Sequence, residues 1–388
     1  MSEEIKGGFA TKAIHAGLDP QQWTHSPVVP PLVMSTTFRH DAPGQHQGYY
    51  YSRSGNPTRD ALQVCLAALE NGTDAKVFSS GLGALTALMS LLQTGDHVVS
   101  GDDIYGGTNR FFKQVASRQN IQVSFVSPED TESFVKAIKA NTKMVWLESP
   151  TNPLMQLADI ETISEEIRKI RSDIYIVVDN TFATCYFQKP LELGADIAMY
   201  SLTKYMNGHS DITMGAAITK RKDIAEKLAF AQKAMGIIPS PYDCALLHRS
   251  LKTLELRMKQ HSKNGLVVAM FLETHPAVTK VMHPFLPSHP QHELAKKQMT
   301  GHSGMLSFYH KGNSLKFFKA LKLFLLAESL GGYESLAELP SVMTHASISE
   351  DEREKLGITD DLIRLSCGIE TTEDLIEDLG RALDAAMS

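Results

Sequence analysis

Residues 174–204 read IYIVVDNTFATCYFQKPLELGADIAMYSLTK and contain two apolar runs that each lead into polar residues. The first run, IYIVVD (174–179), ends at Asp179, and the second, IAMYS (197–201), leads into Lys204. Their length and apolar composition are typical of strands buried on both faces of a sheet. Open α/β sheets bind ligands at the carboxyl ends of their parallel strands. This stretch therefore predicts a buried parallel sheet whose edge carries a carboxylate and an amine.

The same alternation of apolar runs and helical patterns extends from residue 56 to about residue 250. Asn56 followed by Pro57 predicts a helix start, and isoleucines recur on one helical face over residues 160–170. The remaining apolar runs are AKVFS (75–79), HVVSG (97–101), QVSFV (122–126), MVWLE (144–148) and GAAIT (215–219). Together they predict an α/β fold with a mostly parallel seven-stranded sheet and helices on both faces.

Changes in composition and in the pattern of apolar residues divide the chain into three parts. Residues 1–55 are rich in Pro, Gly and Tyr and cannot form a core alone, so we expect an N-terminal arm that lies on another surface, such as a second subunit. Residues 56–250 form the expected large α/β domain, and residues 251–388 a smaller C-terminal α+β domain. Helices are predicted over residues 244–275 and over the amphipathic stretch 317–330.

Composition excludes several classes of function for this 388-residue chain. With 38 basic and 44 acidic residues its net charge is −6, which disfavours binding to nucleic acid or to an anionic membrane. The first residues lack an apolar leader, and the four cysteines are widely spaced, so we expect a cytoplasmic protein with reduced thiols. The paired histidines His289 and His292 lack any zinc-site motif, and no metal is expected.

Four features of the large domain suggest one kind of ligand. SSGLGALTALM (79–89) is a Gly turn that leads into a helix, whose N–H groups would bind an anion such as phosphate, although many such turns only connect a strand to a helix. In SLTK, Ser201 and Thr203 offer hydroxyls, and Lys204 offers an amine able to form a Schiff base. Taken alone, that lysine is better explained as a surface residue after a strand.

The other two features are a carboxylate and an aromatic ring. Asp179 would hold the protonated nitrogen of a pyridine ring, or else cap the turn that follows it. Tyr105, followed by two glycines in DDIYGGT, would stack on a flat ring while the backbone approaches closely. A phosphate cup, a lysine, a ring-nitrogen carboxylate and a stacking aromatic in this order predict a site for pyridoxal 5'-phosphate (PLP).

Ten motifs then resemble the Cys/Met-metabolism class of PLP-dependent enzymes, which have fold type I. The resemblance covers nearly the whole chain, and within the class it is greatest to the animal-type cystathionine γ-lyases. The motifs are YSRSGNPT (51–58), SSGL (79–82), DDIYGGTNR (102–110), ESPTNP (148–153), VVDNTF (177–182), YSLTKYMNGHSD (200–211), SLKTLELRM (250–258), AESLGG (327–332), MTHAS (343–347) and IRLSCGIE (363–370).

The resemblance implies roles for individual residues. Lys204 matches the lysine that bonds covalently to PLP and acts as catalytic base, and Tyr105 matches a stacking tyrosine that helps with the substrate amine. The other residues implied to bind the cofactor are Asp179, Thr181, Gly81, Leu82, Ser201, Thr203, Tyr51 and Arg53, the last two acting across a dimer interface. The residues implied to bind substrate are Arg364, Asn152, Ser329, Glu328, Tyr50, Arg110 and Thr344.

The implied reaction is the γ-elimination of L-cystathionine to L-cysteine, 2-oxobutyrate and ammonia in transsulfuration, by a homotetramer built as a dimer of dimers. The same site would also serve a γ-synthase, a β-lyase or a methionine γ-lyase, or release hydrogen sulfide from cysteine or homocysteine. A non-catalytic scaffold is disfavoured because the lysine, aspartate, arginine and tyrosine are all retained. One departure concerns substrate choice: Tyr50 stands where animal γ-lyases typically carry a glutamate, whereas Glu328 is retained. Gly107 replaces the cysteine typical of bacterial methionine γ-lyases.

Overall fold

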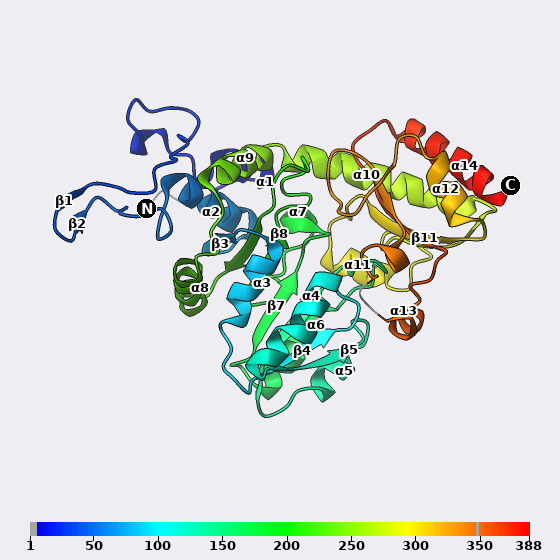
Figure 1. Cartoon of the computed structure of the whole chain (residues 1–388), viewed down its shortest axis with the longest axis horizontal. Coiled ribbons are helices and arrows are strands. Elements are labelled where there is room, and N and C mark those ends of the chain that lie inside the picture. Colours follow the sequence, from blue (N-terminus) through cyan, green and yellow to red (C-terminus); the bar gives the residue numbers. More distant parts are fainter. Residues whose placement is uncertain (1–5, 347–348) are drawn as a thin grey trace.

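The computed structural model describes residues 6–346 and 349–388, so Ser347 of the MTHAS motif lies outside the described residues. Figure 1 shows a large sheet with its helices at the centre of the molecule and a smaller group of strands and helices toward the C-terminus. The N-terminal arm projects from the opposite side of the large sheet.

The large sheet confirms the prediction of seven mostly parallel strands. Five strands run parallel from β5 through β8, while β9 runs antiparallel to both of its neighbours. In spatial order the strands are β3 (Asp74–Phe78), β9 (Gly215–Thr219), β8 (Ile197–Ser201), β7 (Tyr175–Asp179), β6 (Thr142–Glu148), β4 (His97–Gly101) and β5 (Gln122–Val126).

Helices cover both faces of this sheet because its strands are apolar on both sides. In β8, Ala198 and Tyr200 join the core that contains α2, while Ile197 and Met199 join the core that contains α3 and α8. Asn56 caps α2 as expected, accepting hydrogen bonds from the N–H groups of the first turn. The helices are α2 (Pro57–Glu70), α3 (Gly81–Met89), α4 (Gly106–Gln114), α5 (Thr131–Lys136), α6 (Ile160–Ile170), α7 (Thr184–Phe187), α8 (Lys222–Met235) and α9 (Pro241–Leu251).

A second sheet of five strands forms the C-terminal part of the chain. Its central strands are antiparallel, and only the short edge pair β12 and β13 is parallel among the described strands. In spatial order the strands are β10 (Val278–Met282), β11 (Met305–His310), β14 (Leu362–Ser366), β13 (Leu336–Glu338) and β12 (Leu325–Leu326). Its helices are α10 (Leu254–Thr274), α11 (His292–Gln298), α12 (Ser314–Ala320), α13 (Glu350–Leu356) and α14 (Thr372–Met387).

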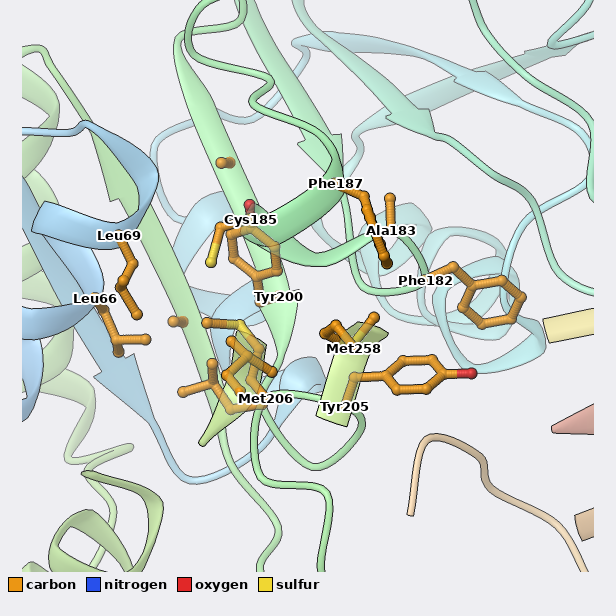
Figure 2. Packing of buried hydrophobic residues seen from close by; sticks show 14 of the residues in the cluster. Leu66, Leu69, Phe182, Ala183, Cys185, Phe187, Tyr200, Tyr205, Met206 and Met258 are labelled. Carbon is orange, nitrogen blue, oxygen red and sulfur yellow. The ribbon is translucent and has the colours of Figure 1, made fainter. Parts of the chain in front are cut away.

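One buried cluster joins the two parts of the chain. Figure 2 shows Leu66 and Leu69 of α2 at one end of this cluster and Phe182 and Tyr205 at the other, with Met258 of α10 between them. We propose a domain boundary near residue 250, as the sequence suggested, but this apolar cluster continues across it. All four cysteines are buried free thiols: Cys65, Cys185, Cys244 and Cys367.

The arm contains little regular structure. It has the helix α1 (Phe9–His15) and a small hairpin of β1 (His40–Ala42) and β2 (Gln45–His46). Val28 and Val29 are largely exposed, as the arm has no core of its own. Among the described residues, no helix combines the length and the apolar character needed to cross a bilayer.

The prediction of one continuous helix over residues 244–275 is wrong. The chain forms α9 and α10 with Lys252 and Thr253 between them. The carbonyl oxygen of Ser250 accepts hydrogen bonds from the Thr253 N–H (3.3 Å) and from the buried Arg257 guanidinium (3.0 Å). These local hydrogen bonds turn the chain between the two helices, which helical periodicity could not reveal.

The prediction of a helix over residues 317–330 is also wrong, because α12 ends at Ala320. The buried carboxylate of Asp378 on α14 accepts the N–H groups of Lys322 (2.9 Å), Leu323 (2.9 Å) and Phe324 (3.1 Å). These bonds hold the segment in a turn before the short strand β12, so a distant side chain overrides the local helical pattern.

Replacing Asp378 by Ala is expected to lower the free energy of unfolding by about 3 kcal/mol, because three backbone N–H groups of this turn and the Arg381 guanidinium lose their acceptor. Thermal and urea unfolding measure the loss. Asp384→Ala is the matched control, since Asp384 lies on the same helix with an 84% exposed side chain. Equal effects of the two substitutions would contradict this role of Asp378.

Candidate functional site

A cavity of about 370 Å³ lies where the large sheet meets the C-terminal sheet. The carboxyl ends of β6, β7 and β8 form one side of it, and residues of β14 and the segment 328–330 form another. The predicted site residues that line it are Gly81, Leu82, Tyr105, Asn152, Asp179, Thr181, Ser201, Thr203, Lys204, Glu328, Ser329, Thr344 and Arg364.

Four predicted residues do not line this cavity. The Tyr50 hydroxyl accepts a hydrogen bond from Lys233 Nζ (2.8 Å), and Arg53 donates to the Lys233 carbonyl (3.0 Å) while lying over the Tyr51 ring. These three residues belong to the arm, at its junction with α2. Arg110 is exposed on α4. The roles expected of all four remain predictions.

Asp179 is held at the end of β7 by its neighbour two residues later. Its Oδ1 accepts hydrogen bonds from the Thr181 N–H (3.1 Å) and hydroxyl (2.5 Å), and the same hydroxyl accepts the Ser201 N–H (2.8 Å). Burial raises the pKa of Asp179 to about 6, although the Thr181 donors oppose this rise. The carboxylate therefore stays mostly ionised at pH 7 and faces the cavity as a fixed negative charge.

Lys204 follows β8 and points its amine toward the C-terminal sheet. Its Nζ donates to the Ser329 hydroxyl (2.7 Å). Burial, aided by the positive charge of Arg364, lowers the pKa of Lys204 to about 8. The backbone φ of Ser329 is +84°, in the left-handed region that residues other than glycine rarely adopt. Strained backbone of this kind is concentrated at functional sites, where the surrounding structure holds it.

Arg364 is buried on β14 with most of its donors already engaged. Its Nη1 donates to Asn152 Oδ1 (2.9 Å) and pairs with Glu338 Oε1 (2.9 Å), and its Nη2 donates to the Ser329 carbonyl (2.6 Å). Its Nε is buried without a partner. An unpaired donor on a rigidly held guanidinium suits the carboxylate of a ligand as an acceptor.

The start of α3 forms the anion-binding end of the cavity. The Ser80 hydroxyl caps the helix by accepting the Gly83 N–H (2.9 Å). A Cβ on Gly81 would lie 3.2 Å from the Ser201 Cβ, so glycine allows the helix start and the end of β8 to approach closely. The helix N–H groups and the Ser201 hydroxyl therefore make a donor set that fits a phosphate group.

Some residues of the cavity were not singled out from the sequence. The most consequential is Glu148, which ends β6 beside Asp179 and could have been found by the same argument about strand ends. Behind the lining, Glu338, the buried partner of Arg364, was also missed, because its role depends on the pairing of β13 with β14, which are distant in the sequence. The remaining lining residues are Ser80, Thr108, Pro150, Phe182, Met199, Thr213 and Leu330.

Comparison with known proteins identifies the family of this chain. The model of the Cys/Met metabolism PLP-dependent enzyme family matches residues 10–384. The chain belongs to this family. It is 55% identical over 381 residues to cystathionine gamma-lyase from Homo sapiens, covering 97% of this chain and 94% of that protein.

Solved structures of the family agree over nearly the full length. A cystathionine gamma-lyase from Lactobacillus plantarum complexed with L-serine is 40% identical with a TM-score of 0.94, covering 98% of this chain and 99% of that chain. A cystathionine gamma synthase from Xanthomonas oryzae pv. oryzae, in complex with aminoacrylate and cysteine, is 39% identical with a TM-score of 0.95 and the same coverage. The fold type I prediction is confirmed.

The chain is therefore a PLP-dependent carbon–sulfur lyase. Its cavity fits the cofactor: α3 and Ser201 suit the phosphate, Asp179 suits a protonated ring nitrogen, and Lys204 supplies an amine with a lowered pKa. Tyr105 lines the same cavity, and a Cβ at Gly107 would lie 2.4 Å from its ring. A side chain at position 107 would thus force the ring to move.

In protein stripped of PLP, the rate of cofactor uptake is expected to rise with pH around a midpoint of about 8, because only neutral Lys204 is nucleophilic and its pKa is lowered to that value. Stopped-flow absorbance measures this rate. Arg364→Leu should move the midpoint upward, since it removes a nearby positive charge. A wild-type midpoint at the ordinary lysine value of 10.5 would contradict the assignment.

Proposed function

We propose that this protein cleaves L-cystathionine by γ-elimination, consuming water and giving L-cysteine, 2-oxobutyrate and ammonia in transsulfuration. The observation that carries the proposal is the joining of Lys204 and Arg364 through Ser329 in one cavity of a chain 55% identical to human cystathionine gamma-lyase. The amine and the guanidinium thereby meet at the place where an amino acid would present its α-carbon and α-carboxylate.

The chain's residues divide the work of this reaction. When bound, PLP supplies an electron sink for the charge that develops at the substrate α-carbon. Arg364 binds the substrate α-carboxylate, aided by Asn152, and orients the α-carbon toward Lys204. The Lys204 amine takes the α-proton when neutral and returns it on the same side. Asp179 holds a negative charge at the ring nitrogen.

Substrate choice depends on the distal end of the cavity. Glu328 lines the cavity and carries a carboxyl group that could bind a distal ammonium. Tyr50 lies outside the cavity of its own chain, and we propose that it reaches a neighbouring subunit's site in place of the glutamate typical of animal γ-lyases. Loss of that charge would weaken the preference for cystathionine over homocysteine, so release of hydrogen sulfide from homocysteine or cysteine is part of the proposal.

Tyr50→Glu is expected to raise the preference for cystathionine over homocysteine. The ratio of kcat/KM for cystathionine to kcat/KM for homocysteine, compared between this variant and the wild type, measures the change.

Product analysis tests the proposed reaction. With L-cystathionine, the holoenzyme is expected to release cysteine and 2-oxobutyrate in equal amounts, identified by mass spectrometry. Release of homocysteine and pyruvate would show β-cleavage and refute the proposal. Lys204→Ala serves as the control, because it removes the base and is expected to abolish the reaction.

We propose further that the active unit is a dimer or a dimer of dimers, and that it works in the cytoplasm. Four buried free thiols support a reducing compartment. The arm supports the shared site, because Tyr51 and Arg53 do not line the cavity of their own chain. In the assembly, the arm would bring them to the phosphate end of a neighbour's cavity.

Subunits carrying Arg53→Ala and Lys204→Ala are expected to recover activity when mixed, because one site of the hybrid dimer then holds neither substitution. Activity of co-expressed, doubly tagged hybrids measures the recovery against each single-variant oligomer. If hybrids are no more active than the single variants, each arm serves its own chain and the shared site is refuted.

A further inference from the structure

The carboxyl group of Glu148 is placed at the centre of the cofactor site without a role in the reaction described above. Glu148 ends β6, lines the cavity and is 6% exposed. In the parallel pairing of β6 with β7 it lies directly opposite Asp179. Partners in parallel register project from the same face of a sheet, so the two carboxyl groups are neighbours.

Glu148 also holds two loops that carry other site residues. Its Oε2 accepts the N–H of Tyr105 (2.9 Å), at the start of α4, and the backbone N–H of Asn152, in the loop after β6, lies close enough to oppose the rise in its pKa. Tyr105 is placed to stack on the cofactor ring, and Asn152 holds Arg364. One side chain therefore fixes the backbone on two sides of the site.

A third carboxyl group lies close by. Asp103 is buried after β4 and accepts a hydrogen bond from the Thr151 hydroxyl. The groups that stabilise the charged forms of Asp103, Glu148 and Asp179 are N–H and hydroxyl donors, while the carboxyl groups repel one another. Three negative charges are unfavourable at neighbouring buried positions. At least one of the three carboxyl groups is therefore expected to remain protonated.

Burial, repulsion between the carboxyl groups and the hydrogen bonds to Asp179 together favour charge on one group over the others. Asp179 receives two bonds to one oxygen from Thr181, and its pKa rises only to about 6. Burial raises the pKa of Asp103 to about 7. Burial and the neighbouring Asp179 raise the pKa of Glu148 well above its usual range. Of the two facing groups, Glu148 is therefore the one that favours the protonated form more strongly.

We propose that Glu148 is a positioning residue of the PLP site, which holds Tyr105 and Asn152 in place as a neutral carboxylic acid and leaves the negative charge to Asp179. A second carboxylate beside Asp179 would repel it, whereas a neutral acid can accept two N–H groups without that cost. The proposal rests on PLP binding and is independent of which sulfur amino acid the enzyme cleaves.

Two variants of Glu148 separate its shape from its charge. Glu148→Gln keeps the accepting oxygen and the neutral state, and is expected to bind PLP within about twofold of wild type. Glu148→Met keeps the length but lacks the oxygen, and is expected to raise the PLP dissociation constant about tenfold. Glu132→Gln, on the exposed face of α5, is the matched control and should change nothing.

The measurements are PLP affinity by equilibrium dialysis, circular dichroism of the bound cofactor, and its visible absorbance against pH, all without substrate. The circular dichroism of the bound cofactor should change in Glu148→Met, because the backbone N–H of Tyr105 loses its acceptor. In Glu148→Gln it should equal the wild-type signal. The absorbance midpoint should stay the same in Glu148→Gln.

Two results would overturn the proposal. A shift of the absorbance midpoint by about one pH unit in Glu148→Gln would show that a negative charge had been removed. Wild-type affinity and dichroism in Glu148→Met would show that the oxygen positions nothing. If Glu148→Met does not fold, Glu148→Gln decides alone, and a tenfold loss of PLP affinity there refutes the role of a neutral acid. Because no substrate is present, none of these results depends on the proposed γ-elimination.

Discussion

The hydroxyl of Thr181 provides the contact on which the geometry of the site depends. It donates to Asp179 at the end of β7 and accepts the N–H of Ser201 at the end of β8. The Thr181 hydroxyl thus links β7 and β8 just beyond the last backbone pair of their parallel ladder. Lys204 lies only three residues after Ser201, so this contact fixes the backbone of Asp179 relative to that of Lys204, while Ser329 holds the Lys204 amine.

The second half of the site comes from the other sheet. Arg364 lies on β14, yet its donors reach Asn152 after β6 and the Ser329 carbonyl, whose own hydroxyl receives Lys204. The two sheets therefore meet through these polar contacts as well as through the shared apolar cluster in Figure 2. Buried charges at such a junction are stable because each has a hydrogen-bonded partner, and the price is that both sheets must be correctly packed before the site exists.

The sequence was most informative where a local rule acts without help from the rest of the chain. Strand ends predicted the places of Asp179 and Lys204, because the pattern of a parallel sheet puts both at one edge. The same rule was not applied to Glu148. Glu338 could not be found, because its function depends on pairing between strands far apart in sequence. The end of α12 was missed for the same reason: Asp378 acts across 54 to 56 residues of chain.

The burial of all four cysteines has a consequence for an enzyme that works on sulfur compounds. Burial raises the pKa of the Cys65 thiol to about 11 and those of Cys185 and Cys244 to about 12, and it raises the pKa of Cys367 as well. Exchange with a disulfide requires an accessible thiolate. Cystine and other disulfides formed from released thiols would find no reactive partner on these side chains, so the folded protein resists covalent trapping by the chemistry it performs.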